Sequence, residues 1–217
     1  MAPEIGQVSS ERIRDELVRI LVEGEAARGV RMLEAAGLAA QVLPELEWND
    51  HIEVCLEHLT VPVKADFAMA VLLHECSADQ ARSVVERLRL SNAQIAHVDA
   101  LVRNQGRFAD VRTMSTSDLK RFLRTGRFED HLELHRIHTV TKSESLEHFD
   151  FVTRRLDRWS GEDLSPSPLI SGEDLITLGL RPGPSFKLIL IAVEDEQLEG
   201  RLSDRESALA FVRERFQ

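Results

Sequence analysis

Histidines provide the first pattern from which chemistry could be built. His74 and Glu75 stand at the end of a long apolar stretch, and His51 precedes them by one predicted helix. A metal hydrolase needs several nitrogen and oxygen ligands that converge on one cation, and two imidazoles with a carboxylate are a start toward such a set. The simpler interpretation is that His74 ends a buried helix and forms an ordinary hydrogen bond.

A second pattern is a stripe of three histidines on one predicted helix. His131, His135 and His138 follow one another at i, i+4 and i+7, so they lie along the same helical face. Such a stripe could chelate a metal, but three ligands on one helix rarely converge without a fourth from elsewhere. Arg136 stands among them and would oppose a cation. We therefore expect an ordinary half-buried or solvated face.

The third pattern is basic. Its residues fall on two predicted helices at helical spacings, and they are Lys120, Arg121, Arg124, Arg154, Arg155 and Arg158. Such side chains could follow the phosphate backbone of an RNA. The alternative is ordinary surface charge that is paired with neighbouring carboxylates such as Asp118 and Asp157.

The charge distribution limits where an RNA could bind. The net charge of the 217 residues is −10, which argues against nucleic-acid binding over the whole surface. Residues 1–60 and 161–217 are net −7 and −5, whereas residues 61–117 and 118–160 are each net +1. Because acidic ends repel a polyanion, we expect phosphate contacts in the middle of the chain, at the six basic residues named above.

Motifs that would identify an enzyme are missing from the sequence. It has no glycine-rich phosphate loop, no G-x-S-x-G turn, no Cys–His pair with motif spacing and no carboxylate pair on an evident strand. Composition and spacing alone therefore describe a helical body without catalytic residues of its own.

The periodicity of apolar residues predicts an all-α fold. Tyrosine is absent and runs of β-branched or aromatic residues are few, which disfavours a sheet. Ile13, Leu17 and Leu21 share one face of a first helix that Ser9 or Ser10 caps. Residues 64–75 are almost all apolar and predict a helix that is buried on most sides. Further helices are expected near residues 25–36, 50–61, 91–105, 118–125, 129–142, 145–158, 171–178 and 184–199, with a last one that Ser203 and Glu206 cap.

The sequence also indicates a linker, the absence of a membrane-spanning run and the state of the cysteines. Ser160 and Gly161 begin a predicted linker, and the SPSP segment at 165–168 is stiff and extended. No apolar run reaches the roughly 20 residues that span a bilayer, and the N-terminus lacks the basic and apolar segments of a signal peptide. Cys55 and Cys76 could form at most one bridge. We therefore expect a reduced, cytoplasmic setting and no membrane partner.

Four stretches together resemble a known family. They are ERIRDELVRIL (11–21), MLEAAGLAAQVLPEL (32–46), RLRLSNAQIAHVDALV (87–102) and PLISGEDLITLGLRPGPSFKLILIAVEDEQLEG (168–200). In this order they are similar to the C-terminal, all-helical neck, body and tail of the class II tRNA nucleotidyltransferase and bacterial poly(A) polymerase family. The last stretch is the most specific of the four.

The resemblance implies a division of labour between this chain and a catalytic head. In that family an N-terminal head with a Gly-Ser or Gly-Gly turn and paired aspartates holds magnesium and the nucleoside triphosphate, and no such residues match here. Magnesium and nucleotide are therefore expected only with a head, supplied in cis or in trans. The resemblance implies a neck-like RNA-binding region over 1–62, an HD-like body over 63–160 and a helical tail over 161–217.

Many members of that family also carry an HD-type phosphohydrolase pattern of a His, a His-Asp pair and a distal Asp. His51 and His74 match its two histidines, Glu75 stands where Asp is usual, and His138 takes the place of the distal Asp. A missing carboxylate leaves a metal short of charge. The resemblance therefore implies that His51, His74 and Glu75 are an empty remnant of a metal site.

Three functions remain open on the sequence. The first is an RNA-binding helical module that holds a tRNA or RNA 3′ end for a catalytic head. The second is an HD-like metal-dependent phosphohydrolase, and the third is a purely structural or dimerisation module.

Overall fold

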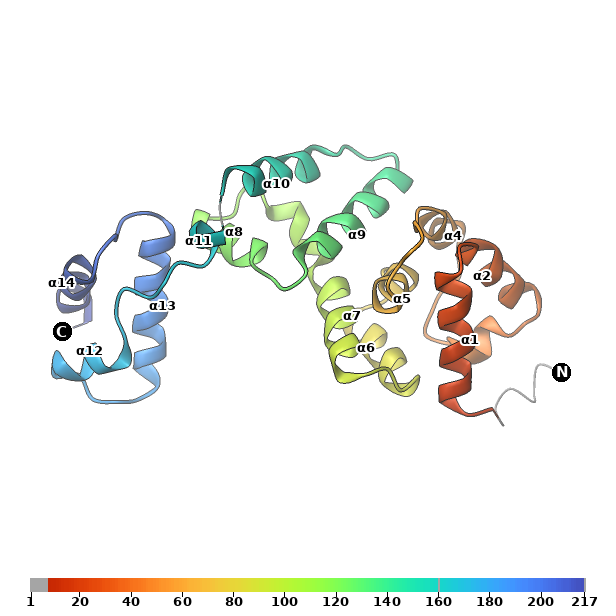
Figure 1. Ribbon diagram of the computed structural model, residues 1–217, viewed down its shortest axis with the longest axis horizontal. Helices are drawn as coiled ribbons and strands as arrows, with labels where there is room; N and C mark the ends of the chain where they lie inside the picture. The colour runs from red at the N-terminus through yellow and green to blue at the C-terminus, as the bar shows by residue number, and fades with distance from the viewer. Residues whose placement is uncertain (1–7, 160, 217) are drawn as a thin grey trace. The chain divides into compact units, whose positions relative to one another are not determined.

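The computed structural model describes residues 8–159 and 161–216, and these residues form helices joined by loops without any strand (Figure 1). The predicted all-α class is confirmed. Within the described ranges, no helix has both the length and the apolar character that crossing a membrane requires. Residues 1–7, which contribute to the expectation of no signal peptide, and Ser160, where the linker was expected to begin, lie outside the described residues.

The helices follow one another at short intervals. Their bounds are α1 Ser10–Val22, α2 Ala26–Ala35, α3 Ala39–Val42, α4 Asp50–Glu57, α5 Ala65–Leu73, α6 Ala78–Arg87, α7 Asn92–Asn104, the 3₁₀ helix η2 Gln105–Asp110, α8 Thr116–Leu123, α9 Phe128–Thr141, α10 Glu147–Arg158, α11 Gly161–Leu164, α12 Gly172–Thr177, α13 Pro184–Leu198 and α14 Arg205–Phe216. A short helix, α11, therefore occupies part of the predicted linker.

The chain folds as two compact units, each formed from two segments. Unit 1 comprises Met1–Ala109 with Glu129–Phe149, and unit 2 comprises Asp110–Phe128 with Asp150–Gln217. These contact-based units cut across the sequence-based division into 1–62, 63–160 and 161–217. That division concerns the roles of a neck, a body and a tail, and it stays a prediction.

Helix α5 is the centre of unit 1. Eight of its nine residues, from Asp66 to Leu73, are buried, as the continuous apolar run predicts. Its buried side chains join one core with residues of α1, α2, α4, α6 and α7, and Leu134 and Ile137 of α9 belong to the same core. A helix that is apolar on all sides must be surrounded, so α5 fixes where its neighbours lie.

Several helix ends are set by the caps that the sequence predicts. The side chain of Ser9 accepts a hydrogen bond from the first turn of α1, and Ser91 and Gln94 form the predicted capping box of α7. The expected capping by Ser203 and Glu206 is wrong, because Asp204 accepts the backbone N–H of Ser207 at 2.8 Å. A carboxylate one residue later therefore takes the place of the serine hydroxyl.

Unit 2 contains a small core in its C-terminal part. Six buried residues compose it: Ile170, Leu175, Ile189, Val193, Ala208 and Val212. Figure 1 shows the helices that carry them, α12, α13 and α14, in the blue part of the chain. Helix α8 packs on α13, and Arg121 forms ion pairs with Glu194 at 2.6 Å and with Asp195, while Arg124 contacts Glu194 at 2.8 Å. Salt bridges therefore fasten α8 to α13.

Replacing Glu194 with Gln should destabilise unit 2 by about 0.5–1 kcal/mol at pH 7, because the two guanidinium groups lose a charged partner that is only partly exposed. Although burial opposes ionisation, the hydrogen bonds from Arg121 and Arg124 hold the pKa of Glu194 below its usual range. A carboxyl with a lowered folded pKa stabilises above its unfolded pKa, and that contribution is lost as pH falls through the folded value. The difference between the two proteins should therefore shrink as the pH falls below the unfolded pKa of about 4.3, and it should vanish once the folded carboxyl is protonated.

Urea unfolding monitored by circular dichroism at pH 7 and pH 3.5 measures this difference. Glu214→Gln on α14 is the matched control, since Glu214 is exposed and has no ion pair among the described residues. Equal stability of the Glu194→Gln and Glu214→Gln proteins at pH 7 would show that the ion pairs contribute nothing.

Candidate functional site

Three histidines from three helices of unit 1 meet in one cluster. His51 lies in the first turn of α4, His74 is the residue that ends α5, and His138 lies on α9. One ring nitrogen from each falls within 4.8 Å of the others. The ring centroids are 5.2–5.3 Å apart and the rings meet edge to face, so the three imidazoles are nearly equidistant.

Backbone and amide groups fix the orientation of this cluster. The carbonyl of Val71 accepts a hydrogen bond at 2.7 Å from Nδ1 of His74, and Nε2 of the same ring therefore keeps its lone pair. Asn49 caps α4 by accepting the N–H of Ile52 at 3.0 Å. The amide of Asn49 also donates to Oε2 of Glu75 at 2.6 Å, which holds the carboxylate beside the cluster.

Of the residues matched to the HD-type pattern, Glu75 is the one that stays at the edge. Its Oε1 lies 3.8 Å from Nε2 of His51, beyond ordinary hydrogen-bond distance. The closest contact between imidazoles is 3.3 Å, between Nε2 of His51 and Nδ1 of His138. The structure therefore brings the rings of His51, His74 and His138 together and leaves Glu75 beside them.

Burial makes all three imidazoles weak bases. It lowers the pKa of His51 and of His74 below the ordinary value, although Glu75 opposes the shift in both. Burial, followed by the charge of Lys142, lowers the pKa of His138 to about 4. The three rings are therefore neutral at neutral pH, which is the form in which an imidazole binds a metal.

A thiol closes the inner side of the cluster. Cys55 Sγ lies 3.6 Å from Nε2 of His51, 3.8 Å from Nε2 of His74 and 3.3 Å from the hydroxyl of Thr141. Burial raises the pKa of Cys55, so this group is a neutral thiol. On the outer side the cluster borders a cavity of about 510 Å³ that Glu75, Gln80, His138 and Lys142 help to line.

The histidine stripe on α9 does not act as one unit. His131 is 2% exposed, and its ring centroid lies 6.2 Å from that of His97. His135 stacks on Phe108 with centroids 4.2 Å apart. Because His138 alone of the three joins His51 and His74, the stripe does not form a metal site of its own in the described residues.

The predicted basic residues divide into three groups. Arg121 and Arg124 are held in the ion pairs with α13 described above. Lys120 donates to the carbonyl of Leu198 at 2.9 Å and lies over the ring of Trp159, and Arg155 lies over the same ring. Arg154 and Arg158 are exposed, and the described part of the chain offers them no ion pair.

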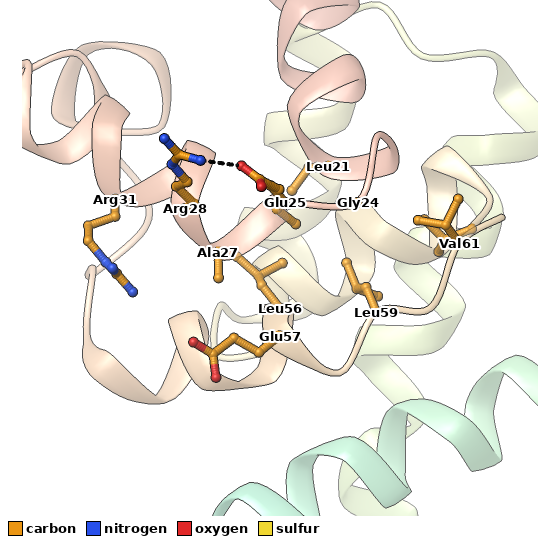
Figure 2. A pocket seen from close by; sticks show the side chains of 12 residues that line it. Leu21, Gly24, Glu25, Ala27, Arg28, Arg31, Leu56, Glu57, Leu59 and Val61 are labelled. Carbon is orange, nitrogen blue, oxygen red and sulfur yellow. Dashed lines mark hydrogen bonds and ion pairs between the residues drawn. The ribbon is translucent and has the colours of Figure 1, made fainter.

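Sequence reasoning missed a cavity of about 430 Å³ between the start of α2 and the end of α4. Figure 2 shows Arg28 and Arg31 of α2 and Glu57 of α4 among its lining side chains. Arg28 contacts Glu25 at 2.8 Å, and Arg31 pairs with Glu53. Glu25 is the N-cap residue of α2, but its side chain forms no hydrogen bond with the first turn of that helix. Because both arginines lie in an acidic segment, composition gave no signal for this site.

Comparison with known proteins identifies similar sequences. Residues 1–49 match the family model described as the probable RNA and SrmB-binding site of polymerase A. A CC-adding tRNA nucleotidyltransferase of Thermus thermophilus is 28% identical over 93% of this chain and 56% of its own length. An A-adding tRNA nucleotidyltransferase of Deinococcus radiodurans is 27% identical over 93% of this chain and 57% of its own length.

The chain thus spans somewhat more than half the length of these relatives. A further A-adding enzyme, from Halalkalibacterium halodurans, is 41% identical over 28% of the chain. The matched segment at 1–49 contains α1, α2 and α3. The cavity with Arg28 and Arg31 is lined partly by residues of this segment and partly by residues that follow α4 or end it. The chain is therefore similar, over most of its length, to the helical region of class II tRNA nucleotidyltransferases, and residues 1–49 match a probable RNA-binding segment.

Proposed function

We propose that this chain binds the 3′-terminal part of a tRNA, or of another structured RNA, and holds it for nucleotide addition by a catalytic head. The observation that carries the proposal is the match of residues 1–49 to an RNA-binding family model. The names of the aligned relatives, which are tRNA nucleotidyltransferases, support tRNA as the substrate class.

We place the first RNA contact at the cavity lined by Arg28 and Arg31. Both side chains are well exposed, at 69% and 58%, so a phosphate can reach them. The start of α2 adds the partial positive charge of a helix N-terminus on the same side. A bound phosphate would take the place of the Glu25 and Glu53 carboxylates as acceptor for these guanidinium groups.

We place a second contact at Arg154 and Arg158 of α10. They stand at i and i+4, both are exposed, and neither is engaged by a carboxylate among the described residues. Of the other basic residues expected to contact RNA, Arg121 and Arg124 stabilise unit 2 through Glu194, while Lys120 and Arg155 lie over Trp159. These four would have to give up contacts within unit 2 before they could contact phosphate.

Nucleotidyl transfer itself belongs, in this proposal, to a head that contributes paired carboxylates, magnesium and nucleotide. CC-adding and A-adding enzymes align over the same large share of the chain. We therefore assign the selection of the nucleotide to the head and the binding of RNA to the helices of this chain.

Replacing both Arg28 and Arg31 with Ala should weaken binding to tRNA about tenfold at 0.1 M salt, uniformly across sequences, because two phosphate contacts are lost. The slope of the logarithm of affinity against the logarithm of salt concentration should decrease by about 2. Fluorescence anisotropy with labelled tRNA at two salt concentrations measures both quantities.

The matched control is the Arg82→Ala, Arg103→Ala protein, which also loses two exposed, ion-paired arginines from unit 1. It should bind like wild type. A third protein, with Arg154→Ala and Arg158→Ala, tests the second contact. If it alone loses affinity, the cavity at α2 is not the RNA site, and if all proteins bind alike, the RNA surface lies on other residues.

The purified chain by itself should add no nucleotide to any RNA. Incubation with labelled ATP or CTP, magnesium and mixed tRNA should give no product above a heat-inactivated control, because phosphoryl transfer needs the metal-binding carboxylates of a head. Extension of the RNA by the chain alone would place a transfer site within these helices and contradict the division of labour.

A further inference from the structure

The histidine cluster disagrees with the metal site that the HD-type pattern implies. That pattern supplies carboxylates as well as imidazoles, and the sequence alone suggested a set that was one carboxylate short. The structure fills the gap with the ring of His138, so the donor set consists of three nitrogens. Glu75 does not complete a carboxylate set, since one of its oxygens accepts from Asn49 and the other lies 3.8 Å from His51.

We propose that His51, His74 and His138 hold one borderline divalent metal ion, with Zn²⁺ as the best fit, through three imidazole nitrogens. Imidazole suits zinc, copper, nickel and iron, whereas magnesium and calcium prefer oxygen ligands. An imidazole in place of the distal carboxylate therefore shifts the preference of the site from oxygen-binding ions such as magnesium toward ions such as zinc.

The spacing of the rings fits a tetrahedral ion. Zinc–nitrogen bonds of about 2.0–2.1 Å at tetrahedral angles place two ligand nitrogens roughly 3.3–3.4 Å apart. Nε2 of His51 and Nδ1 of His138 lie 3.3 Å apart, and the third nitrogen falls within 4.8 Å.

The ring of His74 has the second hydrogen-bond partner that is typical of a metal-bound imidazole. Metal-bound imidazoles almost always donate their other N–H to a carbonyl or carboxylate, which fixes the tautomer. His74 does so toward the carbonyl of Val71, and its Nε2 faces the cluster side, where it lies 3.8 Å from Cys55 Sγ. Glu75 adds a negative charge next to His51 that partly balances the ion.

Three protein ligands leave a fourth position for water or substrate, which is the arrangement of catalytic rather than structural zinc sites. The cavity beside the cluster gives access to that position, and Glu75 and Lys142 both line it. A carboxylate and an ammonium group at the open side would suit a polar ligand better than an apolar one.

Protein purified without a metal-affinity tag, dialysed against Zn²⁺ and then against metal-free buffer, tests the proposal. Elemental analysis should give about one zinc per chain, and competition with a chromophoric chelator should give the affinity. His138→Ala should weaken zinc binding at least a hundredfold, since even loss of an outer-shell partner costs ten- to a hundredfold. His51→Asn, at a partly exposed position, repeats the test in case the first variant folds poorly.

His58→Ala is the matched control, because His58 also lies at an end of α4 but bonds only the carbonyl of Val54 in the described residues. It should retain full zinc. Zinc should also raise the melting temperature of wild type and His58→Ala but not of His138→Ala. Cys55→Ser should retain one zinc, which shows that imidazoles suffice.

Two results would overturn the proposal. The first is wild-type protein that retains no more zinc than His138→Ala, since the rings would then form only a hydrogen-bonded cluster. The second is loss of zinc in Cys55→Ser, because the thiol rather than the third imidazole would then hold the ion.

Discussion

The burial of α5 is the constraint on which most of unit 1 depends. A nine-residue helix that is apolar on nearly every side is stable only when other helices surround it. Its neighbours include α1, α2 and α4, so the segment that matches the RNA-binding family model is anchored to this core. The same burial places His74, at the end of α5, next to α4 and α9. One packing requirement thus positions both the proposed RNA contact and the histidine cluster.

A second constraint is the excess of carboxylates. Most arginines of the chain have acidic partners close by, as Arg28 has Glu25 and Arg121 has Glu194. A cation in such a pair can stabilise the fold or bind phosphate. Because it must first give up its carboxylate partner, its net free energy of phosphate binding is smaller than that of an unpaired cation. This competition favours weak, salt-sensitive RNA binding that becomes strong only when a head contributes a further surface.

The sequence was most informative where a local pattern decides the structure. The buried helix α5 and the cap Ser91 follow from residues within one or two turns and were predicted correctly, and Ser9 was one of the two caps expected for α1. Long-range pairing was not accessible: nothing near Arg121 shows that Glu194, 73 residues away, neutralises it. The meeting of His51, His74 and His138 followed from a family pattern rather than from spacing, because only the packed helices bring these rings together. Arg28 and Arg31 were not singled out, because they lie in an acidic segment of the sequence.

The proposed contact of α2 and its surroundings with RNA can be tested directly. Photo-cross-linking of tRNA that carries 4-thiouridine near its 3′ end, followed by mass spectrometry of the linked peptides, tests this claim directly. Cross-links should concentrate in peptides from residues 24–35 and 53–61, which contain most of the residues that line the cavity with Arg28 and Arg31. Cross-links confined to other helices, or none that compete with unlabelled tRNA, would contradict the proposed contact.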